Sequence, residues 1–171
     1  MEPIKKILID TNAYSSFMAD NQLILDYIVD SEIIYLSSIV IGELFAGFFG
    51  GKKVTENRHD LKNFIGKSGV QIFDVTIETA EIFGEVKNEL RKKGKMIPIN
   101  DIWVAAQTIE TGSKLITFDS HFDNISGLRI WEEIVKKYNK CLKRIRFLSH
   151  FLHNFRARNA PTWLRQDKRT A

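Results

Sequence analysis

The chain has 171 residues, 44% of them hydrophobic and 27% charged, which is enough for one globular domain with a hydrophobic core. A single cysteine, Cys141, excludes a framework of internal disulfides. There is no signal-peptide pattern in MEPIKKILIDTN and no run of about 18 apolar residues, so we expect a cytoplasmic protein without a membrane span.

Short apolar runs alternate with longer segments of helical periodicity along the chain. In chain order we expect a strand at 6–10, a helix at 21–29, a strand at 32–39, a helix at 39–51, a helix at 55–67, a strand at 70–75, a helix at 76–93, a helix at 101–111 and a strand at 114–119, with a fifth strand at 128–133. This alternation predicts an α/β domain with a mostly parallel sheet flanked by helices.

Three acids stand at the ends of expected elements. Asp10 follows the first strand, Asp101 opens a helix in IPINDIWVAAQ, and Asp119 ends the fourth strand. Each has an ordinary structural explanation, because Asp stabilises turns and the N-terminal ends of helices. Each also stands where parallel α/β sheets carry their chemistry, at the carboxyl ends of strands. Taken singly, these residues leave both interpretations open.

A fourth acid, Glu43, lies inside the mostly apolar segment IVIGELFAGFFGG. Burying an unpaired carboxylate is costly and usually neutralises it. No Lys or Arg lies within one helical turn of Glu43, so we expect a cation from elsewhere to face it. A functional role is therefore the better interpretation of this residue.

A parallel sheet would place all four acids at one edge. Four ionised carboxylates cannot share a pocket without cations, because they repel one another. Ligand sets made only of oxygen suit Mg²⁺ or Mn²⁺ rather than structural zinc. The sequence therefore predicts a divalent-metal site of the kind that activates water for phosphodiester hydrolysis. The alternative enzyme is a phosphatase with Asp10 as nucleophile, although that chemistry usually needs an acid two residues later, where Asn12 stands.

Four motifs in this order resemble the PIN domain: DTN after the first strand, IGEL in a helix, NDxWxAA in a helix, and LITFDxxF. The chain resembles in particular the VapC toxins of toxin–antitoxin systems, over roughly Ile7 to Glu132. The resemblance implies a PIN-like three-layer fold and a Mg²⁺- or Mn²⁺-dependent endoribonuclease. It also implies an RNA substrate, a cognate antitoxin that occludes the site, and a homodimer of the toxin. A non-catalytic PIN-like module that binds RNA or a partner remains the alternative.

The resemblance also assigns roles to individual residues. It implies that the metal-binding and catalytic acids are Asp10, Glu43, Asp101 and Asp119. The positions that it implies as supporting are Asn12, Thr117 and, as a second acid ranked below Asp119, Asp123. The histidines form no metal-ligand spacing with Cys141, so we expect no ligand role for His59, His121, His150 or His153.

The C-terminal tail matches no motif of the family. From Asn139 onward there are nine Lys and Arg against one acid, Asp167, whereas the first 138 positions hold 16 basic and 20 acidic residues. We therefore divide the chain into a nuclease domain at 1–138 and a basic extension at 139–171, partly helical or disordered. The extension could be a native RNA-binding segment, a readthrough product or added sequence. Its apolar residues could instead form a helix that docks on the body: Leu142, Ile145, Leu148 and Leu152.

Overall fold

The computed structural model describes residues 5–131 and contains a four-stranded sheet whose paired strands are all parallel. The strands are β1 (Lys6–Ile9), β2 (Ile33–Ser37), β3 (Val70–Phe73) and β4 (Lys114–Ile116). The helices are α1 (Thr11–Met18), α2 (Gln22–Val29), α3 (Ser38–Phe49), α4 (Val54–Ile65), α5 (Ile77–Lys93) and α6 (Ile99–Glu110), followed by a short 3₁₀ helix, η1 (Ser120–Asn124). The predicted α/β class is confirmed.

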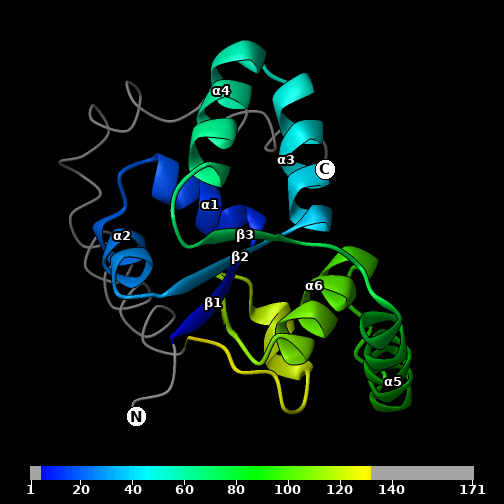
Figure 1. Cartoon of the computed structure of the whole chain (residues 1–171). Coiled ribbons are helices and arrows are strands. Elements are labelled where there is room, and N and C mark those ends of the chain that lie inside the picture. Colours follow the sequence, from blue (N-terminus) through cyan, green and yellow to red (C-terminus); the bar gives the residue numbers. More distant parts are fainter. Residues whose placement is uncertain (1–4, 132–171) are drawn as a thin grey trace, which may run out of the picture.

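The sheet has the order β3-β2-β1-β4, and β1 lies between β2 and β4. Leu8 is in register with Tyr35 of β2 and with Leu115 of β4. Ile7, Leu8 and Ile9 are fully buried, as expected for a parallel strand that is covered on both faces. In Figure 1, α3 and α4 stand above the strands and α5 and α6 lie below them. This layering explains why the strand segments read as continuous apolar runs.

Three differences from the sequence-based expectation concern the elements that carry the predicted acids. The helix α1 was not predicted, and it starts directly after Asp10. The strand β4 ends at Ile116, so Asp119 lies beyond the strand and caps η1 instead. The helix α6 begins at Ile99, which places Asp101 in its first turn rather than at its start. Each shift is small, and none moves an acid away from the carboxyl edge of the sheet.

The fifth strand is reduced to one bridge in the part of the chain that the structure describes. Leu115 and Ile130 form an isolated parallel bridge, and the description ends at Trp131. The basic extension 139–171, with Cys141, His150 and His153, lies outside the described residues. Within residues 5–131, no helix is both long and apolar enough to cross a membrane.

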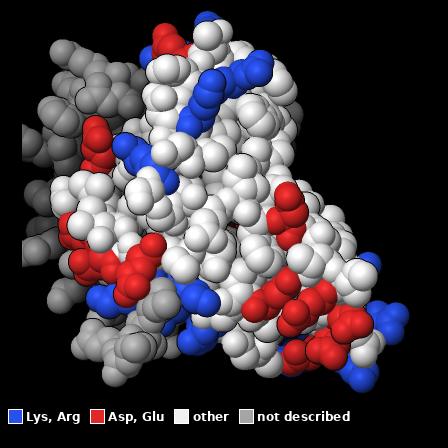
Figure 2. Space-filling view, in the orientation of Figure 1, with Lys and Arg blue, Asp and Glu red and all other residues white. Residues whose placement is uncertain are grey.

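The helices α5 and α6 pack on each other and extend away from the sheet (Figure 1). The α5 N-terminus has a capping box between Thr76 and Thr79, and its C-terminus ends at Gly94 with φ of 64°, a left-handed conformation that glycine adopts at little cost. The rings of Phe83 and Trp103 stack with centroids 3.8 Å apart. Figure 2 shows acidic side chains gathered over this pair of helices. That face is therefore a poor surface for a polyanion.

Candidate active site

Asp10 is the most deeply placed acid at the carboxyl edge of the sheet. It follows β1 directly, and its side chain is 6% exposed. One carboxylate oxygen accepts a hydrogen bond from the backbone N–H of Ala13 at 2.7 Å, so Asp10 caps α1. The other oxygen accepts a hydrogen bond from the hydroxyl of Thr117, which follows β4. The residue is thus a helix cap and, at the same time, a carboxylate held between two adjacent strands.

Asp101 and Asp119 lie next to each other, with His121 beside both. The imidazole Nδ1 of His121 lies 3.2 Å from Asp119 Oδ1 and 3.8 Å from Asp101 Oδ2. One ligand atom from each of the three side chains lies within 4.8 Å of the other two. The spacing between these groups is suitable for one ion. The sequence analysis expected no ligand role for His121, and the structure places its imidazole beside two of the predicted acids.

His121 is close to the acids because of a local turn. Its backbone N–H donates to Asp119 Oδ1 at 2.9 Å, so the chain folds back at the start of η1 and brings the imidazole to the carboxylate. The signal in the sequence was the spacing of two residues between Asp119 and His121, which suits an Asx-turn. A search for His and Cys spacings could not find it, because the other members of the group are carboxylates.

Glu43 lies in the second turn of α3 and is only partly buried. Its Oε2 accepts from the Thr11 hydroxyl at 2.5 Å, and its Oε1 accepts from Asn100 Nδ2 at 2.9 Å. The sequence analysis expected a buried Glu43 that faces a cation from elsewhere, and the structure shows a side chain that is only partly buried. Neutral donors from α1 and α6 hold the side chain, and no cation of residues 5–131 is paired with it. These two bonds orient Glu43 toward the neighbouring acids.

The pKa values of Asp10 and Asp101 are shifted by burial and by the charges of neighbouring acids. Burial raises the pKa of Asp10 to about 7, the hydrogen bonds from Thr117 and Ala13 oppose that rise, and the charges of Asp119 and Asp101 add to it. Burial also raises the pKa of Asp101 to about 6.

The charges of Asp119 and Glu43 raise the pKa of Asp101 further, while His121 opposes the shift. Asp10, Glu43, Asp101 and Asp119 are called the acidic cluster below. The charges of Asp101 and Asp119 act on Asp10, and those of Asp119 and Glu43 act on Asp101, while of the four only Asp101 and Asp119 lie within 4.8 Å of each other and of His121. Within residues 5–131, no Lys or Arg forms an ion pair with any of these four acids.

The three supporting positions differ in their placement. Thr117 is fully enclosed, donates to Asp10 and accepts the backbone N–H of Asp119 at 3.0 Å. Its hydroxyl therefore links two members of the acidic cluster. Asn12 is exposed in the first turn of α1, and Asp123 is exposed in η1. Thr11 and Asn100, which the sequence analysis did not select, make the contacts to Glu43.

The donor set of the acidic cluster fits a hard divalent cation. Carboxylate oxygens dominate it, and oxygen ligands suit Mg²⁺ and Mn²⁺. The raised pKa values of Asp10 and Asp101 are those of carboxylates that gain from a nearby positive charge. His121 adds a nitrogen donor at the edge of the group, which Mn²⁺ accepts more readily than Mg²⁺.

Comparisons with known proteins agree with this arrangement. Residues 7–128 match the PIN domain family. A relative from Rickettsia felis, described as ribonuclease VapC2, is 31% identical over 93 residues, which cover 54% of this chain and 68% of the relative. A ribonuclease VapC2 from Haemophilus influenzae is 32% identical over 95 residues, which cover 55% of this chain and 70% of the relative.

Solved structures give the same result for the fold. VapBC2 from Rickettsia felis, bound to a DNA fragment from its promoter, superposes with a TM-score of 0.65 at 26% identity, covering 73% of this chain and 96% of the solved chain. DNA-bound VapBC from Salmonella typhimurium superposes with a TM-score of 0.64 at 24% identity. The match covers 74% of this chain and 96% of the solved chain. The chain belongs to the PIN-domain family, and within it to the VapC ribonucleases.

Proposed function

We propose that this protein is an endoribonuclease that hydrolyses RNA phosphodiester bonds with the help of Mg²⁺ or Mn²⁺, and that it is the toxin of a toxin–antitoxin pair. The observation that supports the proposal is the acidic cluster: Asp101 and Asp119 lie beside His121, their charges act on the buried Asp10, and the charge of Glu43 acts on Asp101. The curated relatives are described as ribonucleases, which supports RNA as the substrate.

Each residue of the site contributes a specific part of the mechanism. Asp10 supplies a buried carboxylate whose orientation is set by Ala13 and Thr117. Asp101 and Asp119 supply further carboxylates from α6 and from the start of η1. A divalent ion held by these carboxylates would make water more acidic and would stabilise the leaving oxygen of a phosphodiester.

Glu43 borders the acidic cluster on the α3 side, where Thr11 and Asn100 fix its two oxygens. A fixed carboxylate can accept a proton from an attacking water or contribute to ion binding. His121 is placed to hold or release a proton beside Asp119, or to complete the ligand set.

The partners follow from the same family. Solved relatives are described as VapBC proteins and as a toxin–antitoxin complex, so we propose a cognate antitoxin that binds this chain. We also propose that the chain acts as a homodimer in the cytoplasm, where RNA and an antitoxin are both available.

The test of the activity is cleavage of total RNA by the purified full chain, with cleavage sites mapped by sequencing of the new ends. We expect cleavage in Mg²⁺ or Mn²⁺, none in excess chelator, and recovery when the ion is restored. Glu43→Gln keeps the shape of the side chain but removes its charge, and we expect it to lose cleavage while still binding RNA. The matched control is Glu85→Gln on the exposed acidic face of α5.

Three results would contradict the proposal. Equal cleavage with and without chelator would exclude the metal-assisted reaction. Full cleavage by Glu43→Gln would remove this residue from the site. If the parent chain bound RNA at all ion concentrations without cutting it, the protein would be a non-catalytic binding module.

A further inference from the structure

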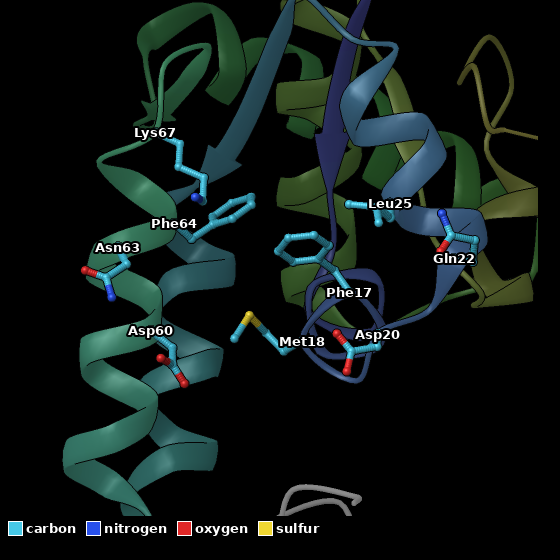
Figure 3. A pocket seen from close by; sticks show the side chains of 9 residues that line it. All are labelled: Phe17, Met18, Asp20, Gln22, Leu25, Asp60, Asn63, Phe64 and Lys67. Carbon is cyan, nitrogen blue, oxygen red and sulfur yellow. The ribbon is translucent and has the colours of Figure 1, made fainter.

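The described part of the chain has grooves of different charge. A groove of about 410 Å³ lies between α4 and the pair formed by α1 and α2, and Figure 3 shows the side chains that line it. Asp20 and Asp60 line this groove together with Lys67, so it is a poor site for a polyanion. A smaller groove of about 220 Å³ lies along α5, and its lining includes two cations and no acid: Gly84, Lys87, Asn88, Arg91 and Met96.

One side of α5 supplies most of the smaller groove, which is called the α5 groove below. Gly84, Lys87 and Arg91 follow one another at spacings of three and four positions, so they lie on one stripe of the helix. A Cβ atom added at Gly84 would meet nothing within 4 Å, so this position leaves open space on the stripe. Met96 comes from the segment after α5 and is 53% exposed. The α5 groove is therefore open to a ligand from solvent.

The two cations of the α5 groove are not compensated by their own helix. Lys87 and Arg91 are four positions apart, and like charges at this spacing repel each other and destabilise a helix. Among residues 5–131, neither forms an ion pair, whereas Lys93 pairs with Glu89 at 2.5 Å. The helix dipole favours cations in the last turn of α5, but Lys87 lies before that turn. An anion from outside the helix would compensate both charges.

Neutral neighbours hold the two cations in place. Arg91 Nη2 donates to Asn88 Oδ1 at 3.0 Å. Lys87 Nζ lies 5.4 Å from the centroid of the Phe83 ring, which stacks on Trp103 of α6. Both contacts orient a positive charge without neutralising it. The α5 groove therefore presents two oriented cations to an anionic ligand.

The acidic face of α5 lies on a different side of the helix from the α5 groove. Figure 2 shows acidic side chains over α5 and α6. At 3.6 residues per turn, the stripe of the α5 groove points about 120° away from the stripe of exposed acids on α5: Glu78, Glu81 and Glu85. One helix thus separates a face that repels a polyanion from a groove that attracts it.

The α5 groove lies close to the elements that carry the acidic cluster. Met96 stands five positions before Asp101, so their Cα atoms are at most about 18 Å apart. In the last turn of α5, Lys93 Nζ donates to Ser126 Oγ at 2.9 Å and lies 3.5 Å from the backbone oxygen of Asn124. The same end of α5 therefore contacts the segment that follows Asp119. An RNA strand bound at the acidic cluster can reach the α5 groove within a few nucleotides.

We propose that the α5 groove is a subsite for a backbone phosphate of the RNA substrate, a few nucleotides from the bond that is placed at the acidic cluster. Lys87 and Arg91 bind the phosphate, and the open space at Gly84 lets the strand approach them. Contacts of this kind add affinity and position a strand without reading its sequence. The inference rests on the proposed function, because it takes RNA as the substrate.

The test is RNA binding by the full chain, measured by fluorescence anisotropy with a labelled oligo-uridine in excess chelator. One test variant combines Lys87→Gln with Arg91→Gln. The other is Gly84→Leu, which fills the α5 groove without changing the charge. The matched control combines Lys52→Gln with Lys62→Gln, which removes two exposed cations from the α3–α4 side of the sheet (Figure 1). Circular dichroism and thermal denaturation check the fold, and Gly84→Leu should raise the Tm because glycine destabilises a helix interior.

We expect the Kd for RNA to rise about tenfold in both groove variants and at most about twofold in the control. The slope of log K against log salt should become shallower by about 0.7 for each phosphate contact that the Lys87 and Arg91 substitutions remove. In cleavage assays with Mg²⁺ or Mn²⁺, the groove variants should raise KM and leave kcat near that of the parent, because the contact is made equally in the ground state and the transition state.

Three outcomes would overturn the subsite. The first is an equal Kd and an equal salt slope for the Lys87 and Arg91 variant and the control. The second is parental binding by Gly84→Leu, which would show that the two cations act without the groove. The third is a parent chain that binds no RNA.

The binding results separate this inference from the proposed nuclease activity. A parent chain that binds RNA through the α5 groove but cuts none with any divalent ion would refute the nuclease and support the subsite. A parent chain that cuts RNA, with groove variants that bind and cut like the control, would refute the subsite alone.

Discussion

Asp10 shows how one residue can serve both the fold and the site. Its carboxylate caps α1 through Ala13 and is also tied to Thr117. The ordinary explanation of an Asp after a strand, that it supports the following turn, is therefore correct here. It does not exclude the functional one, because the same carboxylate belongs to the acidic cluster and its pKa is raised by burial and by its neighbours.

The raised pKa of Asp10 leads to a prediction about pH and stability. Burial raises this pKa from 3.8 to about 7, so the folded state binds the proton more tightly than the unfolded state. The stabilising contribution is fully present below about pH 4 and is lost as the pH rises toward 7. We expect Asp10→Asn, which keeps the helix cap but cannot ionise, to gain several degrees in Tm relative to the parent between about pH 4.5 and pH 7.5.

Thermal denaturation in chelator measures this effect. The control is Asp30→Asn at the exposed end of α2, whose Tm should run parallel to that of the parent. A constant difference between Asp10→Asn and the parent at all pH values would contradict the assigned pKa.

Thr117 is the residue through which the fold positions two acids. Thr117→Val keeps the shape but removes the donor to Asp10 and the acceptor of the Asp119 N–H. We expect a loss of about 1–3 kcal/mol in the free energy of unfolding, together with slower RNA cleavage. Thr117→Ser restores the hydroxyl and should recover most of both. If Thr117→Ser were as impaired as Thr117→Val, the hydroxyl would not be the group that matters.

The strand segments could be predicted from the sequence, and one helix could not. Runs such as KILI are apolar because β1 is covered on both faces. The segment TNAYSSFM of α1 lacks such a signal, since its Thr, Asn and Ser residues compete for backbone hydrogen bonds in other conformations. It is helical because Asp10 caps it and because Ala13 and Tyr14 pack into the core. Tertiary contacts therefore decide this element.

The cap of α5 gives a prediction at the scale of an element. Thr76 accepts from the N–H of Thr79, and its hydroxyl donates to Glu110 of α6 at 2.7 Å. Thr76→Ala should lower the free energy of unfolding by about 1 kcal/mol, with RNA cleavage unchanged because the start of α5 is remote from the acidic cluster. Chemical denaturation measures the change, and the exposed Thr55→Ala on α4 is the control. An unchanged free energy of unfolding would show that the capping box is not stabilising.

At the scale of the whole molecule, the parallel topology explains why the acids could be expected at one edge. Asp10 and Asp119 follow strands, and Asp101 lies in the first turn of a helix, so their approach follows from the order of the elements. The partners of Glu43 could not be foreseen, because Thr11 and Asn100 lie 32 and 57 positions away.

Ion binding should stabilise the fold through the same group of acids. A cation that binds only the folded chain raises its Tm in proportion to the logarithm of ion concentration over Kd. We expect Mg²⁺ or Mn²⁺ to raise the Tm of the parent at neutral pH and to have a much smaller effect on Asp101→Asn. The exposed Asp26→Asn on α2 should respond like the parent. Equal stabilisation of all three proteins would place the ion elsewhere.

The measurement that tests the central claim most directly is single-turnover RNA cleavage by Asp10→Asn in saturating Mg²⁺ or Mn²⁺, with Asp30→Asn as the control. The substitution preserves the cap of α1 and removes the charge at the centre of the acidic cluster. We predict that Asp10→Asn folds and binds RNA but cleaves it at least about 100-fold more slowly than the parent, while Asp30→Asn cleaves normally. Cleavage by Asp10→Asn at the rate of the parent would contradict a metal-assisted reaction at this site.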